Sequence, residues 1–180
     1  TRDGKLIAQF GEQRRIPLSY DAIPRQLINA VLAAEDDRFF QHSGVDYPGL
    51  ARAILRHLLS GEKNEGGSTI TMQLTRGIFL SPEKSYRRKM LEILLTLRIE
   101  QQFTKQEILT LYMNKMFLGQ RAYGVGAASE VYFGKPIDQL TLPEIALIAG
   151  TFRLPSRDNP VANPVFAKHR RSYVLRRMRE

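Results

Sequence analysis

The apolar residues of segment 24–39 recur at helical spacing, and a glutamate shares their face. Ile28, Leu32, Glu35 and Phe39 follow one another at steps of four, three and four residues, which places them on one side of an α-helix. Pro24 suits the first turn of that helix, because its fixed backbone angle is already helical. Since this face must pack against a core or a cleft wall, the pattern predicts a desolvated position for Glu35.

A glutamate in such a position has two interpretations, and this stretch alone favours neither. Burial disfavours the charged carboxylate and raises its pKa toward the range that is useful for general acid or base catalysis. Alternatively, Glu35 pairs with a basic residue from elsewhere and is structural, because buried ion pairs also perturb pKa values.

The composition indicates one globular domain with an anionic partner. The chain has 180 residues, of which 43% are hydrophobic and 25% charged, enough to bury a core in a single domain. Lys and Arg number 27 against 18 Asp and Glu, so nucleic acid, phospholipid and phosphorylated substrates are the candidate ligands. With no Cys and three widely separated His, neither a disulfide framework nor a metal centre built on thiolate or imidazole is expected.

The ends of the sequence suggest a piece of a longer protein. An initiator Met and a signal peptide are both missing, and the last residues continue an apparent helix. No apolar run is long enough to span a bilayer. We expect residues 1–20 to form an extended lead-in or a short hairpin, and residues 21–180 to form one domain.

A helix is predicted from Asp46 and Pro48, and a polar loop follows it. Basic residues flank the apolar face of this helix, which suits an anionic membrane surface, although a surface helix packed on the core explains the pattern more simply. The loop, residues 61–68, reads GEKNEGGS and nearly spells a phosphate-binding P-loop. Gly67 stands where that motif needs its lysine, so the nucleotide interpretation fails.

The polar loop delivers a cap for the next helix. Ser68 or Thr69 is predicted to be the N-cap of a helix that runs through Gln73. Free N–H groups at such a helix start can bind an anion or a sugar hydroxyl, and a capped helix after a linker is the alternative.

Positive charge gathers at the start of a helix predicted over residues 81–102, with Ser81 as its N-cap and Pro82 as its first residue. The cations are Arg76, Lys84, Arg87, Arg88 and Lys89. Positive charge at a helix N-terminus opposes the macrodipole, which suggests that an anion binds there. Glu92 lies four residues after Arg88 and marks the edge of this predicted phosphate site, with a surface ion pair as the simpler alternative.

Other local signals set further helix boundaries. Thr104 with Glu107, and Thr141 with Glu144, read as capping boxes. A small-residue helix is predicted between Gly124 and Gly134, and a basic helix from Asn163 to the end of the chain. The cations of the last helix are interpreted as a solvated face. Met90, Leu94 and Leu97 are expected to be the apolar stripe of the helix over 81–102.

Five motifs in this order resemble the peptidoglycan glycosyltransferase domain of class A penicillin-binding proteins, glycosyltransferase family 51, which also occurs as a monofunctional transglycosylase. Residues 35–44, EDDRFFQHSG, resemble E-D-x-x-F-x-x-H-x-G, and residues 66–73, GGSTITMQ, resemble G-x-S-T-I-T-Q-Q. Residues 88–92, RKMLE, are similar to R-K-x-x-E, residues 105–114 to K-x-E-I-L-E-x-Y-L-N, and residues 121–135 to the family's small-residue helix ending in YFGK. Met72, Gly77 and Thr110 depart from the family pattern.

The resemblance implies a mainly α, lysozyme-like, two-lobed helical domain with a membrane-facing small lobe. It also implies an enzyme that polymerises peptidoglycan glycan strands. The 4-hydroxyl of lipid II would attack the lipid-linked growing glycan, with inversion and release of undecaprenyl pyrophosphate. A glycan-cleaving, lysozyme-like or lytic enzyme on the same fold is the alternative, with Glu35 as an acid, and it would not need the cation cluster. A binding module that uses net charge alone is a further alternative.

The resemblance also assigns roles to individual residues. Glu35 would be the base, and Glu92 would act on the pyrophosphate side, directly or through a divalent cation (Mg or Mn); no organic cofactor is implied. Arg76, Lys84, Arg88 and Lys89 would neutralise the departing diphosphate. Ser68, Thr69 and Gln73 would position sugar or phosphate groups.

The implied partners are lipid II, the lipid-linked glycan and the membrane surface, with no nucleic acid. The resemblance also implies a penicillin-reactive transpeptidase domain elsewhere in the same full-length chain, with a chain that carries no such domain as the alternative. The implied location is the extracytoplasmic, periplasmic face of the bacterial inner membrane, with an upstream helix as the anchor.

Overall fold

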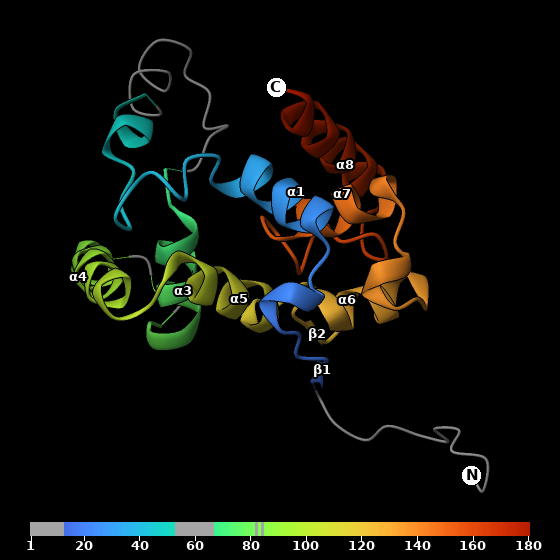
Figure 1. Ribbon diagram of the computed structural model, residues 1–180, viewed down its shortest axis with the longest axis horizontal. Coiled ribbons are helices and arrows are strands. Elements are labelled where there is room, and N and C mark those ends of the chain that lie inside the picture. Colours follow the sequence, from blue (N-terminus) through green and yellow to red (C-terminus); the bar gives the residue numbers. More distant parts are fainter. Residues whose placement is uncertain (1–12, 53–66, 82, 84) are drawn as a thin grey trace, which may run out of the picture.

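The protein is mainly helical, as the sequence predicts (Figure 1). The computed structural model describes residues 13–52, 67–81, 83 and 85–180. The helices are α1 (Arg25–Glu35), α3 (Ile70–Phe79), α4 (Tyr86–Gln102), α5 (Lys105–Lys115), α6 (Val125–Phe133), α7 (Leu142–Thr151) and α8 (Pro164–Arg179). Two short 3-10 helices (Tyr20–Ala22 and Ile137–Gln139) and two short strands, β1 (Arg14–Arg15) and β2 (Ala122–Tyr123), complete the described elements.

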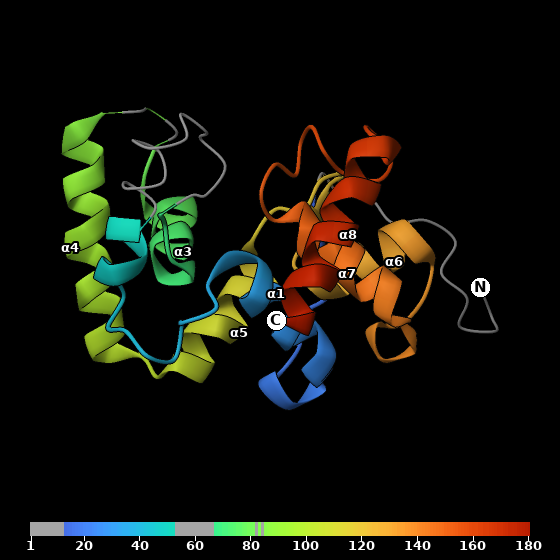
Figure 2. The same ribbon diagram turned by 90° about the horizontal axis from the view of Figure 1, so that it is seen from above.

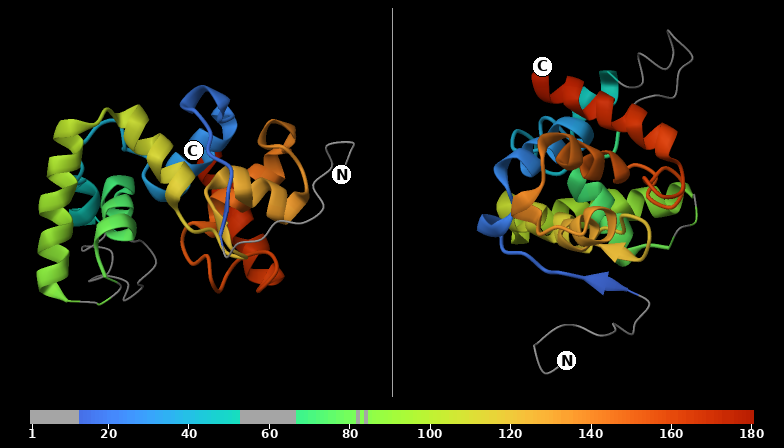
Figure 3. Two further views of the ribbon diagram at one scale, coloured as in Figure 1. Left: turned by 90° about the horizontal axis from the view of Figure 1, so that it is seen from below. Right: turned by 90° about the vertical axis from the view of Figure 1, so that its right-hand side faces the viewer.

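The helices form two groups that α5 connects. Helices α1, α7 and α8 pack on one another, and α6 lies beside α7. Helix α3 packs between α4 and α5, and α4 stands on the far side of it (Figure 2). Seen from below, α5 runs from the C-terminal end of α4 toward α6 (left panel of Figure 3). This arrangement matches the two lobes expected from the sequence, and it places the end of α1 opposite the start of α3.

Helix α1 buries the face that its apolar spacing predicts. Leu27, Ile28 and Val31 are buried in the core, and Glu35 is the last residue of the helix. Phe39 is also buried, but it lies in the turn that follows the helix rather than on the helix itself. Glu35, the candidate functional residue, is therefore at the C-terminus of α1, and its carboxylate projects from that end of the helix.

The lead-in is extended, one of the two forms expected for it, and shows no hairpin between residues 13 and 20. Strand β1 pairs in parallel with β2, with Arg14 opposite Ala122 (right panel of Figure 3). The side chain of Asn114 continues this pairing, because its Oδ1 accepts from the Leu18 N–H at 2.9 Å and its Nδ2 donates to the Leu18 carbonyl at 2.8 Å. Residues 1–12 lie outside the described part of the chain.

Helix α4 begins later than predicted, and its apolar stripe faces outward. Ser85, not Ser81, is its N-cap, and the Ser85 hydroxyl accepts from the Arg88 N–H at 3.1 Å. The expected apolar stripe is outside: Met90 is 66% exposed and Leu94 is 60% exposed. Glu92 and Thr96 are the fully buried residues of this helix. The periodicity correctly grouped the apolar residues on one face of α4. That face is exposed, and the buried face carries Glu92 and Thr96.

The other predicted boundaries are confirmed. Both capping boxes are present, Gly124 and Gly134 are the caps of α6, and Asn163 caps α8. The helix predicted after Asp46 is seen over residues 47–52. Its remainder, most of the polar loop, Pro82 and Lys84 lie outside the described residues.

Gly124→Ala is expected to lower the free energy of unfolding by about 2–4 kcal/mol. Gly124 has a φ of +83°, and a Cβ there would lie 2.5 Å from the Asn114 carbonyl oxygen. Urea unfolding would measure the change. Gly77→Ala is the matched control: its Cβ would meet the Met116 sulfur at 3.5 Å inside α3, so it should be neutral or stabilising by up to about 1 kcal/mol. Equal losses in both variants would contradict this account.

Candidate active site

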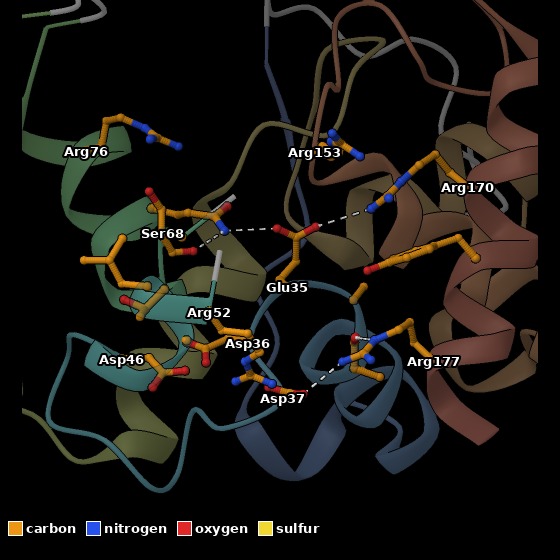
Figure 4. A pocket seen from close by; sticks show the side chains of 18 residues that line it. Glu35, Asp36, Asp37, Asp46, Arg52, Ser68, Arg76, Arg153, Arg170 and Arg177 are labelled. Atoms are coloured by element: carbon orange, nitrogen blue, oxygen red, sulfur yellow. Dashed lines mark hydrogen bonds and ion pairs between the residues drawn. The ribbon is translucent and has the colours of Figure 1, made fainter. Parts of the chain in front are cut away.

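A cleft of about 340 Å³ opens between the two helix groups. The end of α1 forms its floor, the start of α3 one wall, and α8 with the segment after α7 the other. Figure 4 shows Glu35 between Arg76 and Ser68 on one side and Arg153 and Arg170 on the other. The polar residues lining it are Glu35, Asp36, Asp37, Asp46, Arg52, Ser68, Thr69, Gln73, Arg76, Arg153, Arg170, Tyr173 and Arg177.

Glu35 is enclosed in this cleft, with its side chain 9% exposed. Its Oε2 accepts a hydrogen bond from Gln73 Nε2 at 3.0 Å, and Oε1 lies 3.9 Å from Arg170 Nη2. Burial raises the pKa of Glu35 above its ordinary value, while the Gln73 bond and the charges of Arg170 and Arg153 act in the opposite direction. The Arg170 contact is at the outer limit for an ion pair, so desolvation dominates and favours a carboxyl that can exchange a proton.

Asp36 joins the floor of the cleft, at the end of α1, to the α3 wall. Its Oδ2 accepts from the backbone N–H of Ile70, the first residue of α3, at 3.0 Å. The same carboxylate accepts from His42 Nε2 at 3.0 Å, and His42 Nδ1 in turn accepts from the Gly44 N–H at 3.1 Å. Because the backbone N–H can only donate, His42 carries its proton on Nε2. Asp36 and His42 therefore stabilise the local structure. Of the neighbouring acids Glu35 and Asp36, Glu35 is the one that remains available for chemistry.

All three residues predicted to position substrate have hydrogen-bond partners within the fold. Thr69 is the N-cap of α3, and its hydroxyl also donates to the Gly44 carbonyl at 2.5 Å. Gln73 contacts Glu35 directly. Ser68 lines the cleft, and its hydroxyl accepts from Lys89 Nζ at 3.2 Å. The structure brings these three residues to the Glu35 side of α3, and Arg76 follows one turn further along the same wall.

Glu92 is fully buried and held by two cations. Arg88 Nη1 lies 2.7 Å from its Oε2, and Lys89 Nζ lies 2.6 Å from its Oε1. The alternative of a surface ion pair is therefore wrong. Glu92 is not one of the described residues that line the cleft; it reaches the cleft only through Lys89 and Ser68. The position of Lys84 lies outside the described residues.

The divalent cation expected near Glu92 stays a prediction. Each oxygen of Glu92 already accepts from a positively charged side chain, so a metal ion would have to share this carboxylate with Arg88 and Lys89. Within the described ranges, no group of three or more His, Cys, Asp and Glu residues could hold a metal ion.

Arg170 and Arg153 are cleft residues that the sequence reasoning missed. The cations of the last helix were interpreted as a solvated face, which is wrong for Arg170, because it is buried with Ala167 and Val174 on the face of α8 that packs on α7. Arg177 also turns inward and pairs with Asp37 at 2.9 Å. The spacing of Ala167, Arg170 and Val174 at three and four residues was the available signal.

A desolvated glutamate in a cleft lined by arginines, on a helical scaffold, suits proton transfer beside an anionic group, and the comparisons identify the class of protein. The family model described as "Transglycosylase" matches residues 3–179. The chain belongs to this transglycosylase family.

Named relatives make the class more specific. The chain is 53% identical over 178 residues to penicillin-binding protein 1A of Pseudomonas aeruginosa and 55% identical over 176 residues to penicillin-binding protein 1A of Escherichia coli. The alignments cover 99% and 98% of the chain but only 22% and 21% of these relatives. The crystal structure of penicillin-binding protein 1A from Haemophilus influenzae matches with a TM-score of 0.54 and 34% identity, over 98% of this chain and 17% of that one. These names give no support to the glycan-cleaving alternative.

Glu35→Gln is expected to be more stable than the wild type at neutral pH. Because the folded-state pKa of Glu35 is raised above its ordinary 4.5, the unfolded chain releases this proton first, and wild-type stability falls as pH rises above 4.5. The two proteins should converge below that pH. Thermal unfolding across pH would measure the difference.

Glu144→Gln provides a control of opposite sign. Lys135 and Thr141 lower the pKa of Glu144 to about 2, so its carboxylate stabilises the fold above the unfolded pKa, and this contribution disappears as pH falls toward 2. Glu144→Gln should therefore be less stable than the wild type at neutral pH. A Glu35→Gln variant that is less stable than the wild type at neutral pH would contradict the assignment of Glu35 as a desolvated carboxyl with a raised pKa.

Proposed function

We propose that this domain polymerises peptidoglycan glycan strands, with Glu35 as the general base. The observation that carries the proposal is the Glu35 carboxylate, desolvated in a cleft whose walls supply arginines, in a chain of the transglycosylase family. A carboxylate with a raised pKa takes up a proton more readily than an ordinary glutamate, and the arginines provide for an anionic leaving group.

The proposed reaction joins two lipid-linked substrates. The 4-hydroxyl of lipid II gives its proton to Glu35 while its oxygen attacks the anomeric carbon of the growing glycan. The bond from that carbon to the diphosphate oxygen breaks with its electrons on oxygen, so undecaprenyl pyrophosphate leaves with inversion. A diphosphate is already a good leaving group, so charge neutralisation matters more than protonation. Arg76, which lines the cleft wall, is the described residue best placed to supply it, and Lys84 remains a predicted second.

Glu92 acts in this proposal through the cations that it holds. Removing its charge would leave Arg88 and Lys89 with no carboxylate between them at the start of α4, where the macrodipole already disfavours positive charge. Its role is thus to keep Lys89 against Ser68 at the edge of the cleft. No step of the proposed reaction runs through a metal ion.

The exposed apolar side of α3 and α4 is the proposed membrane contact. Its residues are Ile78, Phe79, Tyr86, Met90, Leu91 and Leu94, all more than 40% exposed. Such a patch marks an interaction surface, and lipid-linked substrates require the cleft to lie close to a bilayer. No described helix is both long enough and apolar enough to cross one.

The setting of the domain follows from its relatives. The chain spans about a fifth of the length of the penicillin-binding proteins it matches, and their name leads us to place a penicillin-reactive transpeptidase domain elsewhere in the full-length protein. The same proposal puts the enzyme on the periplasmic face of the bacterial inner membrane, with an upstream anchor.

Glu35→Gln is expected to reduce lipid II polymerisation by about 100-fold or more, in the range that loss of a general base produces. The measurement is glycan-strand formation from labelled lipid II in detergent. Glu130→Gln, on the exposed side of α6, is the control and should polymerise like the wild type. Cleavage of finished glycan by the wild type without polymerisation, or an active Glu35→Gln, would contradict the proposal.

The double variant Met90→Gln, Leu94→Gln should bind lipid vesicles at least about tenfold more weakly, because each apolar side chain contributes roughly 1.5–3 kcal/mol when buried. Flotation with phosphatidylglycerol-containing vesicles would measure this. The matched control, Leu142→Gln with Val165→Gln, removes exposed apolar residues from α7 and α8 and should bind as the wild type does. Equal losses in both double variants would contradict a membrane contact on α4.

A further inference from the structure

We infer that Tyr112 is a positioning residue for Glu35, because its hydroxyl fixes the Gln73 amide in the one orientation that donates a hydrogen bond to the catalytic carboxylate. The inference rests on the proposed function and deepens it. Tyr112 lies on α5, behind the cleft wall, and is not one of the described residues that line the cleft.

The hydrogen bonds form a directed chain. Tyr112 donates its hydroxyl proton to Gln73 Oε1 at 2.9 Å, and Gln73 Nε2 donates to Glu35 Oε2 at 3.0 Å. A weaker contact joins Gln73 Nε2 to the Ser68 carbonyl at 3.4 Å. An amide can turn over and exchange its oxygen and nitrogen. In the turned orientation, its oxygen would face an ionised Glu35 without a proton between them, and only a protonated Glu35 could satisfy it. The orientation of Gln73 and the charge of Glu35 are therefore coupled.

Tyr112 is suited to hold that orientation. Its side chain is fully buried, and its ring stacks on Phe152 with 4.9 Å between the centroids. Burial and the nearby charge of Glu35 raise the pKa of Tyr112 well above its ordinary value, so the hydroxyl keeps its proton and remains a donor. Since the ring cannot move away and the hydroxyl cannot ionise, Gln73 Oε1 stays directed toward α5.

Other charged groups also face Glu35, but from different elements. Arg170 approaches from α8, Arg153 from the segment after α7, and Asp36 from the end of α1. Arg76 and Asp36 also act on Tyr112. None of these contacts involves the Tyr112 hydroxyl bond to Gln73, so removing that hydroxyl tests the amide orientation with the surrounding charges unchanged.

The test is Tyr112→Phe, which keeps the ring and its stacking and removes only the donor. Without it, Gln73 is free to turn and to accept from protonated Glu35, so the acidic limb of the kcat/KM profile for lipid II polymerisation should move to higher pH by about 0.5–1 unit. At a pH on that limb the rate should fall about three- to tenfold, with the alkaline plateau nearly retained. A profile that superimposes on the wild type would overturn the inference.

Tyr132→Phe is the matched control. Tyr132 also donates a partly buried hydroxyl, to the Leu118 carbonyl, at a distance from the cleft. This variant should lose stability without a change in the pH profile. If both variants shift the acidic limb equally, the effect is a general consequence of lost stability and the inference is wrong.

A second readout needs no activity. The pKa of Glu35, followed by NMR of labelled glutamate carboxyls and assigned by its absence in Glu35→Gln, should rise in Tyr112→Phe. In a Gln73→Met background, Tyr112→Phe should leave that pKa unchanged, because the effect passes through the amide. A rise of equal size in both backgrounds would overturn the inference, as would a Tyr112→Phe protein that no longer folds, since the hydroxyl would then be structural.

The two proposals fail in different ways. A wild-type protein that does not polymerise lipid II contradicts the proposed function. An active wild type with identical Glu35 titration in wild type and Tyr112→Phe contradicts only the positioning role.

Discussion

The carboxylate of Asp36 is the interaction on which the cleft depends. It stands at the end of α1 and accepts from the first backbone N–H of α3, so one residue fixes the floor of the cleft to the α3 wall. His42 donates a second hydrogen bond to this carboxylate and accepts one from the Gly44 N–H, so the turn after α1 is also held to Asp36. Gly44 has a φ of +94°, and a Cβ there would lie 2.7 Å from Thr96 Cγ2, so this turn also presses against α4. The two neighbouring acids thus have different roles: Asp36 connects α1 to α3, and Glu35 faces the cleft.

The electrostatics of the cleft follow from where each arginine is anchored. The positive charge of Arg177 is already compensated by Asp37, so Arg177 contributes little to binding an anion. Arg76 and Arg153 line the cleft from opposite walls. Arg170 lies close enough to Glu35 to favour its ionised form but not close enough to neutralise it. The pKa of this base is raised by burial, which helps it to bind the proton of the acceptor hydroxyl, while the arginines still favour its ionised form.

Local signals in the sequence were sufficient for the parts of the fold that are set locally. The capping boxes at Thr104 and Thr141 and the glycines at both ends of α6 predicted helix boundaries that the structure confirms. The spacing around Glu35 predicted the buried face of α1 correctly, but it continued the helix to Phe39, beyond its end at Glu35. Contacts between distant segments were not predictable in this way. Arg170 reaches Glu35 only because α8 packs on α1 and α7, and Tyr112 reaches Gln73 only because α5 packs on α3. Periodicity also identified the apolar face of α4 without saying whether that face meets a core or the surroundings.

Helix α4 exposes apolar residues and buries polar ones, and this affects how readily it unfolds locally. Its fully buried residues are a glutamate and a threonine, and it meets α3 through Thr96 and Thr75, whose hydroxyls lie 3.3 Å apart. Little apolar surface is therefore removed from water where these helices meet, so α4 gains less from the hydrophobic effect than α1 or α7. Segments with few buried apolar contacts open at the lowest free energy and exchange their amide hydrogens first. We therefore expect α4 to open more readily in water than α1 or α7, and an apolar medium against its outer face to hold it in place.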